Sequence, residues 1–160
     1  MSMQRRSRSV EKPVADLLGK RLSTATIMFH SAVADRMGVS VTDAKCRSIL
    51  LQLGPMTAGD IAQRLGLTTG AVTGVIDRLV AAKLVRRVAD PTDRRRVVVE
   101  LLSNPRRERE IEGLFEPMGS RISGLVAGYN DRDQAILAGF LTKACEVLEE
   151  ETHRLRVIRP

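Results

Sequence analysis

Three consecutive arginines, Arg94, Arg95 and Arg96, form a cluster of positive charge, and they directly follow a turn-forming Asp-Pro-Thr-Asp segment. A guanidinium group is less costly to desolvate than an ammonium group, so it suits the narrow, electronegative groove of a nucleic-acid duplex. Asp93 is placed to orient one of the three side chains. A run of charges on a turn is, by itself, more often a solvated surface, so its interpretation depends on the neighbouring elements.

A second set of candidate residues lies on one side of a helix that Thr68 is expected to cap. With Val72, Val75, Ile76 and Leu79 facing inward, helical periodicity turns the following residues outward: Thr69, Gly70, Thr73, Gly74, Asp77 and Arg78. Threonine can contact base edges or a thymine methyl, and Arg78 is better placed for phosphate. The glycines permit close backbone approach at about 1 kcal/mol each relative to Ala. Neutral drift on a solvated surface is the alternative explanation for the glycines.

Periodicity and turn residues predict the elements that carry these groups. Helices are expected at 13–37, at 42–53 with Thr42 as N-cap, and from a Thr57/Asp60 capping box to Gly66. Two strands, 85–89 and 96–101, should form a hairpin with a basic tip, the second strand alternating Val97, Val99 and Leu101 with Arg96, Val98 and Glu100. Long helices should then follow Asn104-Pro105 and Asn130.

This order predicts a mainly α fold with a small β-hairpin wing: a winged helix-turn-helix with long N- and C-terminal helices. We expect a disordered basic arm at 1–12, a long N-terminal helix at 13–38, the winged helix at 39–102 and long C-terminal helices at 103–160. The last helix carries the apolar stripe Ile136, Leu137, Phe140, Leu141, Ala144 and Leu148.

The composition favours a polyanionic partner, because 26 Lys and Arg against 19 Asp and Glu give a net charge of +7. Aromatic residues make up 2% of the chain, too few for a base-stacking platform, which favours duplex DNA over single strands or RNA. Without a signal sequence or a membrane-spanning apolar run, a cytoplasmic location is expected.

Catalysis and metal binding lack candidate residues. The sequence shows no nucleophile motif or paired carboxylates in an apolar setting, and neither His30 nor His153 has neighbours at metal-ligand spacing. No cofactor is expected, and the chain is not predicted to be an enzyme. Cys46 and Cys145 are interpreted as structural, with a redox role as the alternative. The methionines Met28, Met37, Met56 and Met118 are expected in the core rather than in a ligand pocket.

The segment from Gly59-Asp-Ile-Ala-Gln-Arg to Asp77-Arg-Leu, then Leu84-Val-Arg-Arg and Asp90-Pro-Thr-Asp-Arg-Arg-Arg, resembles the MarR family. The resemblance implies a homodimer on a pseudo-palindromic operator, in which the helices at 13–38 and 103–160 are the dimerisation helices. It further implies a recognition helix in the major groove and Arg95, salt-bridged to Asp93, in the minor groove. It also implies a repressor that can respond to a small-molecule effector. A winged-helix scaffold for protein interaction or dimerisation is the alternative.

The residues predicted to contact DNA combine the helix and the hairpin. They are Thr68, Thr69, Gly70, Thr73, Gly74, Asp77, Arg78, Arg86, Asp93, Arg94, Arg95 and Arg96. No ligand-binding residue is assigned.

Overall fold

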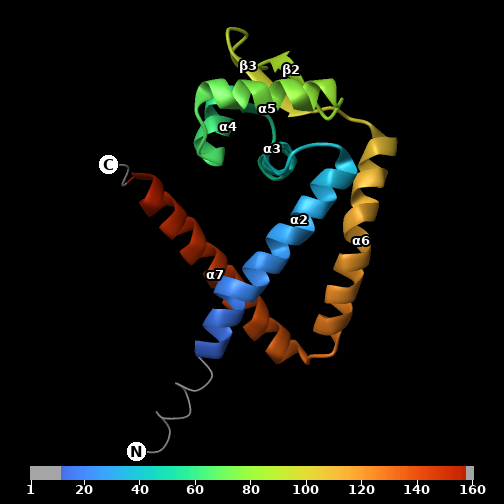
Figure 1. Ribbon diagram of the computed structural model, residues 1–160, viewed down its shortest axis with the longest axis vertical. Helices are drawn as coiled ribbons and strands as arrows, with labels where there is room; N and C mark the ends of the chain where they lie inside the picture. Colours follow the sequence, from blue (N-terminus) through green and yellow to red (C-terminus); the bar gives the residue numbers. More distant parts are fainter. Residues whose placement is uncertain (1–11, 158–160) are drawn as a thin grey trace, which may run out of the picture. The chain divides into compact units, whose positions relative to one another are not determined.

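The computed structural model describes residues 12–157, so the arm expected at 1–12 lies almost entirely outside the described residues. The chain divides into two compact units, Met1–Ser103 and Asn104–Pro160, which are described in turn (Figure 1). The expected fold class is confirmed: helices dominate both units, and a small antiparallel sheet lies in the first.

The first unit begins with a helical stretch that reaches Met37. Its middle part, η1 (Leu17–Leu22), has π-helical hydrogen bonds, and α2 (Ser23–Met37) continues from it. Gly38 ends α2 in the left-handed conformation, at φ 72°, as the sequence predicts for a glycine C-cap. Buried side chains occur in the C-terminal part of α2, at Val33, Ala34 and Met37, whereas η1 has none.

Helix α3 (Val41–Leu53) begins one residue earlier than expected, and its N-cap is Ser40 rather than Thr42. Ser40 has an extended backbone and accepts a hydrogen bond from the N–H of Asp43, whose carboxylate accepts in return from the N–H of Ser40. This reciprocal capping box satisfies two otherwise unpaired amides, which is why the helix starts here. Thr42 already lies within the first turn.

The helix-turn-helix consists of α4 (Ala58–Leu65) and α5 (Thr69–Ala81). The Thr57/Asp60 capping box, the left-handed Gly66 and the Thr68 N-cap are all confirmed. Helix α5 contacts α3, α4 and the sheet (Figure 1). Its inward face is confirmed, because Val72, Val75, Ile76 and Leu79 are buried in the core.

The sheet has three strands rather than the two of a simple hairpin. A short β1 (Met56–Thr57) pairs with β3 (Val97–Leu101), which pairs on its other side with β2 (Val85–Ala89), giving the order β1-β3-β2. The predicted alternation along the last strand is wrong: consecutive Val98 and Val99 are both buried, and Val97 is exposed. The reason is that β3 is the central strand and contacts both α3 and α4.

The second unit contains α6 (Pro105–Ala127) and α7 (Asp131–Val157). Asn104 caps α6 by accepting from the N–H of Arg107, with proline at the first helical position as predicted. Asn130 accepts from the N–H of Asp133 at the start of α7. Most of the expected apolar stripes are exposed in the single chain, including Met118, Ile122, Leu125, Ile136, Phe140, Leu141 and Leu148.

Candidate nucleic-acid interface

The outward side of α5 carries small polar residues and glycine. Thr69, Gly70 and Thr73 are exposed, whereas Gly74 is half-buried. The hydroxyl of Thr68 accepts from the N–H of Ala71 at 3.3 Å, and that of Thr73 donates to the carbonyl of Thr69 at 3.0 Å. These two hydroxyls therefore already serve the helix, which leaves the threonine methyl groups and the Thr69 hydroxyl as the main features of this surface.

The two glycines on this surface are not required by internal packing. A Cβ added to Gly70 would meet nothing within 4 Å, and one added to Gly74 would lie 3.5 Å from Nη1 of Arg78, an ordinary contact. Neither glycine has a positive φ that a side chain would strain. The fold would accept alanine at Gly70, so the missing side chain has no structural reason within the described chain.

Two adjacent arginines on β2 point to opposite sides of the strand. Arg86, one of the predicted DNA contacts, donates from Nε to Oε1 of Glu100 at 2.7 Å, directly across the ladder. Arg87 instead donates from Nη2 to Oδ1 of Asp77 on α5 at 2.6 Å. Sequence reasoning missed Arg87, although the period-2 alternation of a strand already places it on the opposite side from Arg86.

The tip of the wing is a hydrogen-bonded turn organised by Asp90. Its Oδ1 accepts from the N–H of Thr92 at 2.8 Å and from the hydroxyl of Thr92 at 2.6 Å. The hydrogen bond from the Thr92 hydroxyl, and after it the one from the Thr92 N–H, lower the pKa of Asp90. The carboxylate therefore stays ionised and can accept both bonds. Because these bonds fix the backbone of the turn, the exposed arginine side chains start from fixed backbone positions.

Asp93 contacts Arg95 differently from the predicted salt bridge. Oδ1 of Asp93 accepts from the backbone N–H of Arg95 at 3.0 Å. No ion pair between the two side chains occurs among the residues that the structure describes. The reason is the tight turn, in which the Asp93 side chain folds onto the amide two residues ahead. The Arg95 guanidinium is left exposed.

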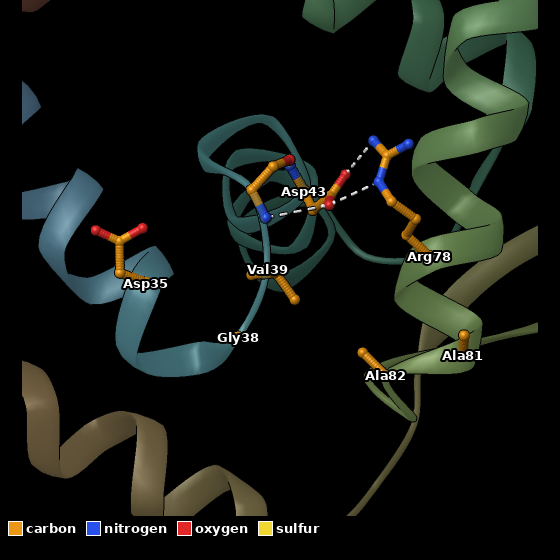
Figure 2. A pocket seen from close by; sticks show the side chains of 8 residues that line it. Asp35, Gly38, Val39, Asp43, Arg78, Ala81 and Ala82 are labelled. Carbon is orange, nitrogen blue, oxygen red and sulfur yellow. Dashed lines mark hydrogen bonds and ion pairs between the residues drawn. The ribbon is translucent and has the colours of Figure 1, made fainter.

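Arg78 is held by a buried carboxylate. Its Nε donates to Oδ2 of Asp43 at 2.9 Å and its Nη2 donates to Oδ1 at 2.7 Å, so the pair is bidentate (Figure 2). Burial raises the pKa of Asp43, but the hydrogen bonds from Arg78 and then Ser40 outweigh it and lower the pKa overall. In return, the hydrogen bond to Asp43 raises the pKa of Arg78.

A pocket of about 660 Å³ opens beside this pair, lined by Asp35, Gly38, Val39, Ser40, Asp43, Arg78, Ala81 and Ala82 (Figure 2). None of the four methionines considered in the sequence lines it. Met37 and Met56 belong to the core, as expected, whereas Met28 and Met118 are exposed.

The two cysteines lie in different settings. Cys46 is fully buried, and burial, followed by the nearby charge of Asp43, raises its pKa to about 11, which keeps it a thiol. Cys145 is exposed and free on α7. Within residues 12–157, no cluster of His, Cys, Asp and Glu could hold a metal ion, and no helix is long and apolar enough to cross a membrane.

Comparison with known proteins decides the family. The model of the MarR family matches residues 39–97, which include both helices of the helix-turn-helix, β2 and the turn of the wing. The uncharacterised HTH-type transcriptional regulator YcgE of Bacillus subtilis is 40% identical over 152 residues, covering 95% of this chain and 97% of that protein. The chain belongs to the MarR family. It is a DNA-binding transcriptional regulator and not an enzyme.

Two further similar proteins have more specific descriptions. The HTH-type transcriptional repressor NicR of Pseudomonas putida is 29% identical over 92 residues, covering 58% of each chain. The solved structure of a mutant of S. aureus MepR bound to an oligodeoxyribonucleotide matches with a TM-score of 0.54 at 20% identity. This match covers 83% of the present chain and 96% of the MepR chain, and at that identity it shows the shared fold.

Proposed function

We propose that this MarR family protein acts in the cytoplasm as a homodimeric repressor that binds a pseudo-palindromic operator. In each half-site, α5 enters the major groove with Thr69, Gly70, Thr73 and Gly74 against the bases. Arg94, Arg95 and Arg96 reach the neighbouring minor groove. The two α5 helices then lie about 34 to 36 Å apart, one turn of duplex DNA. Repression is supported by the similarity to NicR.

The observation that carries this proposal is the combination of an exposed, side-chain-poor α5 surface with a wing tip whose backbone is fixed by Asp90. A helix can approach base edges closely only where its side chains are short. A fixed turn lets guanidinium groups enter a narrow groove with little loss of backbone freedom. A scaffold for protein contacts would need neither feature, and it is not favoured.

Dimerisation is supported by apolar side chains that the single chain leaves exposed. In the first unit they include Leu17, Leu22, Ile27 and Met28, and in the second the stripes of α6 and α7. Exposed apolar surface of this extent marks an interaction surface in a soluble protein. We propose that a second copy of the chain covers this surface, because two copies supply the two recognition helices that a pseudo-palindromic operator requires.

Fluorescence anisotropy tests the proposal, with the duplex upstream of the protein's own gene compared with a scrambled duplex at two salt concentrations. We expect tight, sequence-dependent binding of two chains per site. Arg95→Ala should weaken binding and lower the salt slope by about one, because one phosphate-rich contact is lost. The matched control is Arg132→Ala on α7, which removes the same charge outside the proposed interface. Equal, weak binding to both duplexes, or equal effects of the two variants, would contradict the proposal.

A small-molecule effector that releases the DNA is a further part of the proposal and comes from the family resemblance alone. Calorimetric titration of the purified protein with a panel of aromatic acids tests it. Binding heat together with release of the labelled duplex would support an effector of this class. A panel without heat would remove the class.

A further inference from the structure

The Asp43–Arg78 pair joins two elements far apart in the sequence. Asp43 lies in the first turn of α3, and Arg78 lies in the last turns of α5, 35 residues later. Asp43 is 1% exposed, so its carboxylate is withdrawn from water. Burying a carboxylate is costly unless strong hydrogen bonds replace its water, and here Arg78 and Ser40 supply them.

Helix capping alone does not explain the arginine. The capping box at α4 has the same arrangement, with Asp60 accepting from the N–H and hydroxyl of Thr57. Within the described residues, the hydrogen bonds of the Asp60 carboxylate all come from Thr57, and no ion pair involves it. The capping boxes of α3 and α4 thus differ, because the carboxylate of Asp43 has a second role.

The geometry of Arg78 indicates that role. Asp43 engages Nε and Nη2, whereas Nη1 makes no hydrogen bond within the described part of the chain. Nη1 lies 3.5 Å from the point where a Cβ of Gly74 would stand, on the side of α5 that we propose faces DNA. The Arg78 side chain is 56% exposed despite its anchored position. Its free N–H groups are therefore available to an anion at that surface.

We propose that Asp43 is a positioning residue for DNA binding, holding the Arg78 guanidinium so that Nη1 is presented to a DNA phosphate beside Gly74. This inference rests on the proposed function. An unanchored arginine loses side-chain freedom when it binds, whereas Arg78 has lost that freedom before DNA arrives. Immobilising one such side chain corresponds to about a three- to tenfold change in affinity.

The substitution Asp43→Asn separates this role from simple electrostatics, because the two predict opposite signs. Removing a negative charge near DNA should tighten binding if only net charge matters. If Asp43 positions Arg78, binding to the operator duplex should weaken by about three- to tenfold. Asp60→Asn is the matched control, since it removes a carboxylate from the same capping position and should leave affinity equal or slightly higher.

A thermodynamic cycle with Arg78→Ala tests whether Asp43 acts through Arg78. In the Arg78→Ala background, Asp43→Asn should have no further weakening effect on DNA affinity. A general structural defect would weaken binding in both backgrounds. Circular dichroism and a urea midpoint for each variant establish that the protein is folded at the assay temperature. Should Asp43→Asn not fold, Arg78→Lys provides the second test, because it keeps the charge but loses the bidentate fork and should also weaken binding.

The outcomes distinguish this inference from the proposed function. If the wild-type protein binds the upstream duplex and the scrambled duplex equally, the proposed function is wrong. If the wild type binds its operator and Asp43→Asn binds as tightly as Asp60→Asn, the positioning role of Asp43 is wrong while the proposed function stands. Weaker binding by Asp43→Asn that disappears in the Arg78→Ala background supports the inference.

Discussion

Replacing Gly70 by alanine should make the protein more stable and a worse DNA binder. Gly70 is the second residue of α5, and an added Cβ would meet nothing within 4 Å. Alanine is favoured over glycine by about 1 kcal/mol in a helix interior, because the unfolded chain loses less backbone freedom, and this value is the upper bound in the first turn. For a protein of this length, that bound corresponds to a rise of about 2–4 °C in Tm.

The same methyl group should interfere with the proposed contact between α5 and the major groove. Forcing an extra methyl into a close-packed contact costs about 1–3 kcal/mol, or about 5- to 150-fold in Kd. Stability is measured from the urea midpoint, and affinity by fluorescence anisotropy on the operator duplex. The control is Gly113→Ala in α6, where the added Cβ also meets nothing within 4 Å; stability should rise there without a change in affinity. Unchanged DNA affinity of a stabilised Gly70→Ala protein would refute the close approach of α5.

Three further predictions concern stability and assembly. Leu141→Asp should dissociate the dimer, because Leu141 is 49% exposed in one chain and a carboxylate buried there on assembly would cost several kcal/mol; light scattering measures this, with Thr142→Asp as the neighbouring control. Lys83→Gly should stabilise the protein by about 1 kcal/mol, since Lys83 is a non-glycine residue at φ 56°; a lower urea midpoint would contradict this. Because the pKa of Asp43 is lowered in the folded state, its contribution to stability is present above its ordinary value of 3.8 and is lost as the pH falls below it. Asp43→Asn should therefore flatten the loss of stability below that pH; a wild-type slope in this variant would exclude Asp43 as its source.

Local interactions made much of the helix-turn-helix predictable from the sequence. The Thr57/Asp60 capping box, the Thr68 cap and the buried face of α5 depend on residues within about one or two helical turns of each other, so the sequence contains their signals. The choice of Thr42 over Ser40 as the cap of α3 failed because both are good capping residues and only the position of Asp43 decides between them.

The features that sequence reasoning missed depend on tertiary contacts. The two residues of β1 are too few to show any periodicity, and they form a strand only because β3 has a free edge. The pairing of Asp43 with Arg78 links positions in separate helices, and neither residue type nor spacing indicates it. Arg87 is a partial exception, because strand alternation separates it from Arg86, but only the hydrogen bond to Asp77 places it beside α5.

Thr57 has two attachments whose combined effect is geometric. It caps α4 through Asp60, and within β1 it pairs with Val98 of the wing. The start of the helix-turn-helix and the stem of the wing are thus joined at one residue. In the proposed complex, this shared residue would fix the distance between the contacts that α5 and the wing make in one half-site. We therefore expect operators with a longer or shorter half-site to bind less tightly, whatever their bases.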